Sequence, residues 1–225
     1  MTHSSFMAGD LMNTATVTNR PLQADFLLIA LGSVLVISIP LAIWQIALPG
    51  IDESTALLYT RYTARVSFLF FLPVFTGKAL QVLLPGPITS QLVRRRRHLG
   101  LAFALAHGIH MGAIILLYVT QDRWFTLDDG AALFIYLMLG LMVITSNTFS
   151  VRRLGRGWKW LHKFGMYALF VGFFATYLGR VVEYDAQIEN DSVAEYFWVY
   201  VLLLTTVSCG WLLRIAAYWK PRLRG

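Results

Sequence analysis

The sequence predicts an all-α membrane protein, a bundle of six transmembrane helices with both termini in the cytoplasm. Composition is the first indication, because 57% of the 225 residues are hydrophobic and only 14% are charged, whereas soluble domains carry about 25% charged residues. The apolar residues also gather in blocks of roughly 20, the length that crosses a bilayer core. The net charge of +7 comes from positive residues that flank these blocks, so it indicates membrane topology and not nucleic-acid binding.

Three segments make up the chain. Residues 1–25 are polar, lack the pattern of a cleaved signal peptide, and are expected to form a disordered cytoplasmic tail. Residues 26–219 form the transmembrane domain, and residues 220–225 form a short basic cytoplasmic tail. Within the domain, the apolar blocks predict helices over 26–51, 59–84, 99–121, 130–151, 164–179 and 196–213.

The boundaries of these helices follow from a few residues. The first block is uncharged, and Pro40 inside it removes a backbone donor. The second ends at Pro85-Gly86-Pro87. The fifth block is short, so it must borrow a turn from residues 158–162 to reach spanning length. Cys209 is the single cysteine, which gives no disulfide or thiolate cluster and is expected only to pack.

Charge places the loops on opposite sides of the membrane. Of the 19 Lys and Arg residues, 14 fall on one side, at Arg20 and in segments 94–97, 152–163 and 214–224. The opposite loops hold 10 of the 12 Asp and Glu residues. The positive-inside rule therefore puts both termini in the cytoplasm, and the helices over 99–121 and 164–179 run in the same direction.

Histidines on these two helices are the candidate functional residues. An ionisable side chain inside a membrane helix is costly and indicates a functional site. His107 and His110 lie about 60° apart on one helix face, because the helix turns every 3.6 residues. His162 lies at the inner end of the other helix. Two histidines on facing helices can supply axial nitrogens to a heme iron between them, although each can instead form a hydrogen bond between helices.

Two motifs resemble the ferric reductase-like transmembrane domain family. The first is Arg-Arg-x-Leu-Gly-Leu followed by a histidine near the end of that helix, and the second is Gly-x-x-Trp-x-x-Leu-His two helices later. The resemblance covers roughly residues 55–180 and rests on these residues: Arg96, Arg97, Leu99, Gly100, Leu101, His110, Leu154, Gly155, Trp158, Leu161 and His162, with a weaker match at Thr63-Ala64-Arg65.

The resemblance implies a membrane cytochrome b-like protein, an electron-transfer subunit of an oxidoreductase in a bacterial inner membrane. Electrons would pass through heme b from a cytoplasmic flavin or quinol donor to an acceptor at the outer face. It makes His110 and His162 candidate axial ligands of the heme iron, with Arg65 as a candidate partner of a heme propionate. The arginines at 94–97 would anchor the topology or meet lipid headgroups, propionates or a flavin phosphate.

The sequence also departs from the family pattern. The family has a second histidine about 13 residues further along the fifth helix, where this chain reads Phe174-Ala175-Thr176, so we expect one heme. His110 lies roughly 20 Å beyond Arg97 along its helix, at about 1.5 Å per residue. His162 lies only roughly 9 Å beyond Arg156. By depth, His107 is the better partner for His162, and all three histidines stay candidate ligands.

Two other functions stay open. A heme-free scaffold or partner subunit of the same fold is favoured by the missing histidine and predicts a colourless protein. A proton or solute pathway would use His107, His110 and Arg65 as relay groups. The apolar runs between these residues and the absence of Asp and Glu inside the predicted helices count against such a pathway.

Overall fold

The computed structural model describes residues 52–185 and 195–220. The expected tail at 1–25, the expected helix at 26–51 and most of the basic tail at 220–225 lie outside these residues. The described part is all-helical, with seven α-helices and one short 3-10 helix. They are α2 (Glu53–Leu83), α3 (Pro87–Arg94), α4 (Arg96–Thr120), η1 (Leu127–Asp129), α5 (Gly130–Ile144), α6 (Thr148–Leu154), α7 (Arg156–Val182) and α9 (Phe197–Trp219).

These helices identify a multi-pass membrane protein. Four of them, α2, α4, α7 and α9, are long and apolar enough to cross a membrane. The bent pair of α5 and α6 makes a fifth candidate span if it is counted as one. Each expected helix from 59–84 onward overlaps one of these elements. The expected turn before residue 164 is confirmed, since α7 begins at Arg156.

The expectation of one continuous helix over 130–151 is wrong. The chain breaks at residues 145–147, and α6 leaves α5 at 103°. The hydroxyls of Thr145 and Ser146 donate to carbonyls of the preceding turn, at 2.7 and 2.6 Å, and the Asn147 side chain accepts from the Ser150 amide at 2.7 Å. Side chains of these types compete with the backbone for hydrogen bonds, so they favour the end of one helix and the cap of the next.

Three helices also begin or end at residues other than those expected. α2 begins at Glu53 rather than at residue 59, because the Asp52 side chain caps it by accepting from the Thr55 amide at 2.9 Å. α4 begins at Arg96 rather than at residue 99, so two of the four arginines in segment 94–97 lie on its first turn. α9 continues to Trp219 rather than ending near residue 213. Between α6 and α7, Gly155 has a φ of +51°, which favours glycine.

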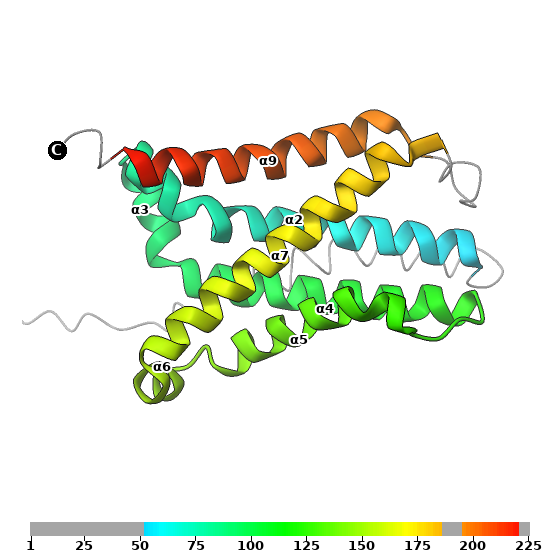
Figure 1. The fold of residues 1–225 in the computed structure, drawn as a ribbon, viewed down its shortest axis with the longest axis horizontal. Helices are drawn as coiled ribbons and strands as arrows, with labels where there is room; N and C mark the ends of the chain where they lie inside the picture. The colour runs from blue at the N-terminus through cyan, green and yellow to red at the C-terminus, as the bar shows by residue number, and fades with distance from the viewer. Residues whose placement is uncertain (1–51, 186–194, 221–225) are drawn as a thin grey trace, which may run out of the picture.

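The helices are arranged around α2, which packs against α4 on one side and α9 on the other. α7 crosses the bundle and packs against α5 and α9 (Figure 1). As the charge pattern predicts, α4 and α7 run in the same direction, from the end that carries α3 and α6 (Figure 1). We call this end of the bundle the basic end, because the arginines of segments 94–97 and 152–156 lie there.

An aromatic cluster joins the helices at mid-height. Phe71 of α2 lies 5.5 Å from Phe103 of α4 and 5.0 Å from Phe173 of α7, measured between ring centroids. Phe68 lies 5.2 Å from Phe173 in the same way. Each such pair contributes about 0.5–1.5 kcal/mol beyond simple burial. The cluster fixes α4 and α7 to α2 at this level, and below it, toward the basic end, the two helices enclose a cavity.

Candidate functional site

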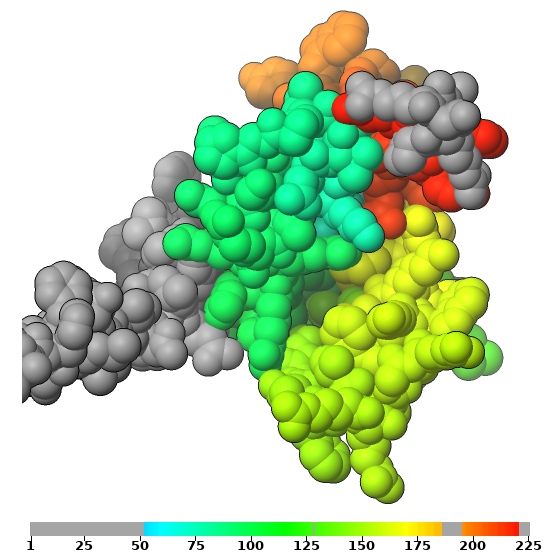
Figure 2. Space-filling view, turned by 90° about the vertical axis from the view of Figure 1, so that its left-hand side faces the viewer, coloured from blue at the N-terminus to red at the C-terminus, as the bar shows by residue number. Residues whose placement is uncertain are grey.

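The cavity lies between the start of α4 and the α5–α6–α7 segment and has a volume of about 720 Å³. That volume is in the range of small-molecule and cofactor sites. Figure 2 shows the basic end of the bundle, hollowed between the first turns of α4 and the α6–α7 segment. Its walls are mainly apolar and include Phe103, Leu139, Met142, Trp158 and Met166.

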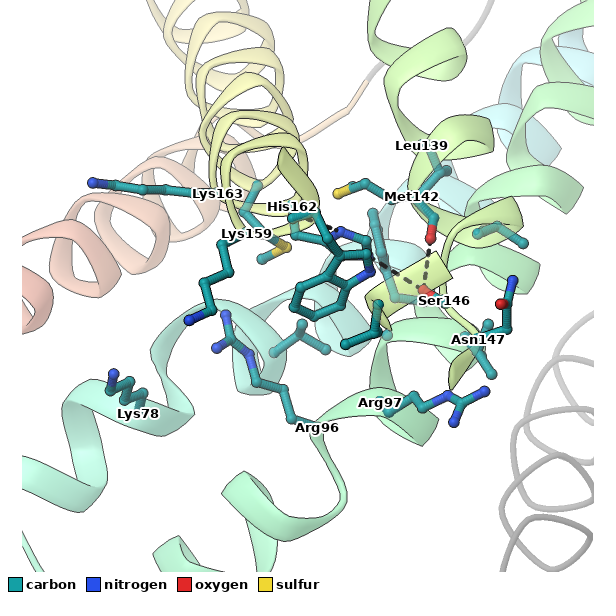
Figure 3. A pocket seen from close by; sticks show the side chains of 18 of the residues that line it. Lys78, Arg96, Arg97, Leu139, Met142, Ser146, Asn147, Lys159, His162 and Lys163 are labelled. Carbon is teal, nitrogen blue, oxygen red and sulfur yellow. Dashed lines mark hydrogen bonds between the residues drawn. The ribbon is translucent and has the colours of Figure 1, made fainter. Parts of the chain in front are cut away.

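His162 lies on the α7 wall of this cavity (Figure 3). Its ring packs against Trp158, one turn earlier, with centroids 4.1 Å apart and planes tilted by 30°. Its Nδ1 lies 3.1 Å from the Trp158 carbonyl oxygen. A carbonyl can only accept, so in the neutral ring Nδ1 carries the proton and Nε2 carries a lone pair. Metal-binding histidines are commonly oriented by such a bond from the other ring nitrogen.

Ser146, at the break after α5, faces His162 Nε2 at 3.4 Å. Its hydroxyl donates to the Met142 carbonyl at 2.6 Å, so its proton is not directed to the imidazole. Nε2, the ring nitrogen with the lone pair, therefore lies against the break after α5, where Ser146 is its polar neighbour.

Six cationic side chains line the cavity and no Asp or Glu does, among the described residues. Arg214 is held in place, since it donates to the Phe75 carbonyl at 2.8 Å and to the Tyr167 hydroxyl at 3.2 Å. Figure 3 shows Arg96 extending toward the α7 side, where Lys159 lies, and Arg97 pointing away from His162. The other two are Lys78 and Lys163. The site therefore suits a ligand with an apolar body and anionic groups.

His107 does not line the cavity. It lies one turn beyond Phe103, whose ring is 5.3 Å from its own, and it is only 7% exposed. Its Nδ1 is 3.1 Å from Ser67 Oγ of α2. Ser67 donates to the Ala64 carbonyl at 2.8 Å, so it accepts the proton of Nδ1. The other face of His107 is covered by Tyr136 of α5, with centroids 4.8 Å apart.

His110 repeats this arrangement one turn along α4. Its Nδ1 lies 3.2 Å from Thr63 Oγ1, and the Thr63 hydroxyl donates to the Tyr59 carbonyl at 2.8 Å. The rings of His107 and His110 are 5.4 Å apart. The structure thus brings these two histidines together against α2, while His162 belongs to a separate group on the cavity.

Arg65 lies away from the cavity, toward the opposite end of the bundle. Its guanidinium pairs with Glu195, which precedes α9. The same carboxylate lies 3.6 Å from Arg61 Nε and accepts from the Tyr200 hydroxyl. The observed role of Arg65 is to join α2 to the start of α9.

The sequence did not indicate several residues that lie at the cavity or beside the histidines. Arg214 was assigned only to topology, although it lies five residues from the end of a helix and reaches the cavity. Ser67 and Thr63 are four residues apart and therefore lie on one face of α2, opposite His107 and His110, which a helix-pairing argument could have found. Met142 and Met166 carried no signal beyond hydrophobicity.

Comparison with protein-family models, curated proteins and solved structures finds no match for this chain. The described residues also hold no group of three or more His, Cys, Asp or Glu side chains placed to bind a bare metal ion. The chemistry of the site must therefore be argued from the cavity itself.

The cavity residues fit a heme. His162 offers one imidazole nitrogen, the walls are apolar, and the cationic rim matches the two carboxylates of the porphyrin. The described lining residues include no second histidine.

Proposed function

We propose that this protein is a membrane cytochrome b-like electron carrier with one heme b in the cavity between α4 and α7. It would act as an electron-transfer subunit rather than as a complete enzyme. The observation that carries this proposal is the position of His162, whose Nε2 lone pair lies at the wall of an apolar cavity with a cationic rim. The resemblance to the ferric reductase-like family supports the same reading.

The residues of the site would have different roles in binding the heme. Heme, when bound, supplies one-electron transfer between ferric and ferrous iron. His162 would hold the iron, with its orientation set by the Trp158 carbonyl. Arg96, Lys159 and Arg214 would bind the propionates, and their charge favours the reduced state. The apolar side chains of α5 and α7 exclude water from the ring.

The charge pattern supports an inner-membrane location with both termini and the basic end in the cytoplasm. Electrons would enter at the basic end from a cytoplasmic flavoprotein or from quinol, and a bound flavin or quinone would serve as a further cofactor. An acceptor at the outer face would receive them.

A reduced-minus-oxidised absorption spectrum of the detergent-purified protein tests this function. We expect a b-type signal in the wild type and its loss in His162→Ala. Lys220→Ala, at the end of α9 and outside the cavity lining, should keep the signal. A colourless wild type, expressed with added heme, would contradict the proposal.

A second candidate is a heme-free subunit of the same fold, whose cavity holds another anionic amphiphile. The hydrogen bonds of His107 and His110 to Ser67 and Thr63 favour it, because they give these histidines a role in packing α4 against α2.

A further inference from the structure

We propose that the connection between α4 and α5 is a membrane-interface anchor, in which Trp124 and Leu127 insert into the lipid surface at the end of the bundle opposite to the basic end. This α4–α5 connection comprises residues 121–129. It lies at the far end of the bundle from α3 and α6 (Figure 1). The inference goes beyond the heme site and does not depend on it.

Two large apolar side chains of the connection are exposed. In the run Trp124-Phe125-Thr126-Leu127, Trp124 is 81% exposed and Leu127 is 98% exposed. Phe125 is partly covered, because its ring packs against Tyr118 of α4 with centroids 4.9 Å apart. Leaving apolar side chains in water is unfavourable, and neighbouring exposed ones mark an interaction surface. Trp124 and Leu127 are therefore the residues whose exposure indicates a partner.

The polar groups of the connection bond to one another around Asp129. Its Oδ1 accepts from the Tyr118 hydroxyl at 2.7 Å and from the Arg123 guanidinium at 3.0 Å. Its Oδ2 accepts from the Thr126 amide at 2.8 Å. The Arg123 guanidinium also lies over the Tyr118 ring, 4.5 Å from its centroid. These contacts give the connection a defined shape against α4, with its two most exposed apolar side chains on the outside.

The connection also stays close to the ends of the two helices that it joins. The Arg123 amide donates to the Tyr118 carbonyl at 2.8 Å, so the chain remains on the last turn of α4 up to the residue before Trp124. Leu127 is the first residue of η1, which continues directly into α5 at Gly130. Both apolar side chains are therefore held near the level at which α4 and α5 leave the membrane.

The chemistry of this surface fits lipid. Ile115 and Val119 of α4 are exposed apolar residues, and their four-residue spacing places them on one helix face. The apolar surface of a membrane-spanning helix thus reaches the start of the connection. The indole of Trp124 combines an apolar ring with one N–H donor, which suits the headgroup level of a bilayer. Leu127 adds an apolar side chain that suits the region just below.

Fluorescence quenching in nanodiscs tests the anchor on the full-length protein. Leu127→Cys in a Cys209→Ser background carries an environment-sensitive fluorophore, and the quenchers are iodide in water and nitroxide lipids labelled near the headgroup or near the chain end. We expect emission shifted to shorter wavelength, strong quenching by the headgroup-level nitroxide, weaker quenching by the chain-end nitroxide, and little by iodide.

Asp185→Cys in the same background is the matched control. Asp185 is exposed and follows α7, which runs in the same direction as α4, so it lies at the same end of the bundle. A label there should be quenched by iodide and not by lipid nitroxides. The native indole is tested separately, since the difference in tryptophan quenching between the wild type and Trp124→Phe should show the same preference for the headgroup-level nitroxide.

Two results would overturn the inference. Emission and iodide quenching at Leu127→Cys equal to those at Asp185→Cys would place the connection in water. Protection from iodide and from both nitroxide lipids would show that protein covers this position, either a second copy or another part of this chain. Neither result changes the absorption spectrum that tests the heme site, so the two proposals fail independently.

Discussion

Met142 of α5 occupies the space above Gly165 of α7, so that a Cβ built on Gly165 would lie 2.6 Å from the Met142 sulfur and 3.2 Å from its Cγ. Real Cβ atoms do not approach this closely, so any larger residue must displace the methionine. Glycine therefore allows α5 and α7 to approach each other beside the cavity.

Gly165→Ala should destabilise the protein by about 1–3 kcal/mol, because overpacking forces side chains from their preferred rotamers. Thermal unfolding in detergent measures the effect. Gly179→Ala on the same helix is the control, since a Cβ there meets no atom within 4 Å and alanine favours the helix. Equal losses in the two glycine variants would contradict close packing at Gly165.

Ser67→Ala should cost about 1–3 kcal/mol, because it leaves the buried Nδ1–H of His107 without an acceptor. The total loss of stability in the double variant Ser67→Ala/His107→Phe should be smaller than the sum of the two single losses, since the two residues share one interaction. Ser208→Ala is the control, because its hydroxyl bonds within α9. Strictly additive losses would show that the hydrogen bond contributes nothing.

Glu195→Gln should destabilise the protein by roughly 3 kcal/mol, because it removes the carboxylate between Arg61 and Arg65. Glu195 is only 14% exposed at its side chain, so solvent screening is weak. Chemical unfolding in detergent measures the change. Glu53→Gln, at an exposed carboxylate bonded to Gln121, should change stability by less than about 0.5 kcal/mol. A small effect at Glu195 would contradict its role in joining α2 to α9.

The pKa of Asp129, in the loop after α4, should depend on the hydrogen bonds that its carboxylate accepts. The Tyr118 hydroxyl, 2.7 Å away, and the Thr126 amide, at 2.8 Å, lower its pKa to about 2. The unfolded value is about 3.9, so the contribution to stability is full above about pH 4 and disappears as the pH falls through 2. Carboxyl NMR titration measures this midpoint, and Tyr118→Phe should raise it. A midpoint near 3.9 in the wild type would contradict the observed bonds.

Membrane orientation is testable without purification. Green fluorescent protein fused after residue 225 should fluoresce, and alkaline phosphatase fused after Thr126 should be active, because the first position is expected inside and the second outside. Phosphatase fused after Arg153 should be inactive. The opposite pattern would invert the topology and move the basic end of the bundle to the outer face.

Much of the helical order follows from composition and a few special residues. Apolar blocks of spanning length predicted the cores of α2, α4, α7 and α9, and the charge pattern predicted the shared direction of α4 and α7. The break at Thr145–Asn147 was missed because the surrounding residues are apolar, and block length alone does not register hydroxyl and amide side chains that cap helices.

The candidate site was less predictable, because it depends on where side chains point. Helical spacing placed His107 and His110 on one face correctly, but did not show that Ser67 and Thr63 of α2 lie opposite. Depth along the helix indicated His107 as the partner of His162. It gave no sign that Phe103 and not His107 lines the cavity, since His107 is held against Ser67 by the tertiary packing of α2 against α4.

Hydrophobic mismatch follows from the length of α5. Its 15 residues cover about 22 Å at 1.5 Å per residue, which is short of the roughly 30 Å hydrocarbon core of a bilayer. Lipids next to α5 must therefore shorten or tilt to keep its ends covered, while the sharp turn into α6 carries the chain sideways. Such local thinning would bring the membrane surface toward Ser146, and under the proposed function it would shorten the path from an electron donor at the basic end to His162.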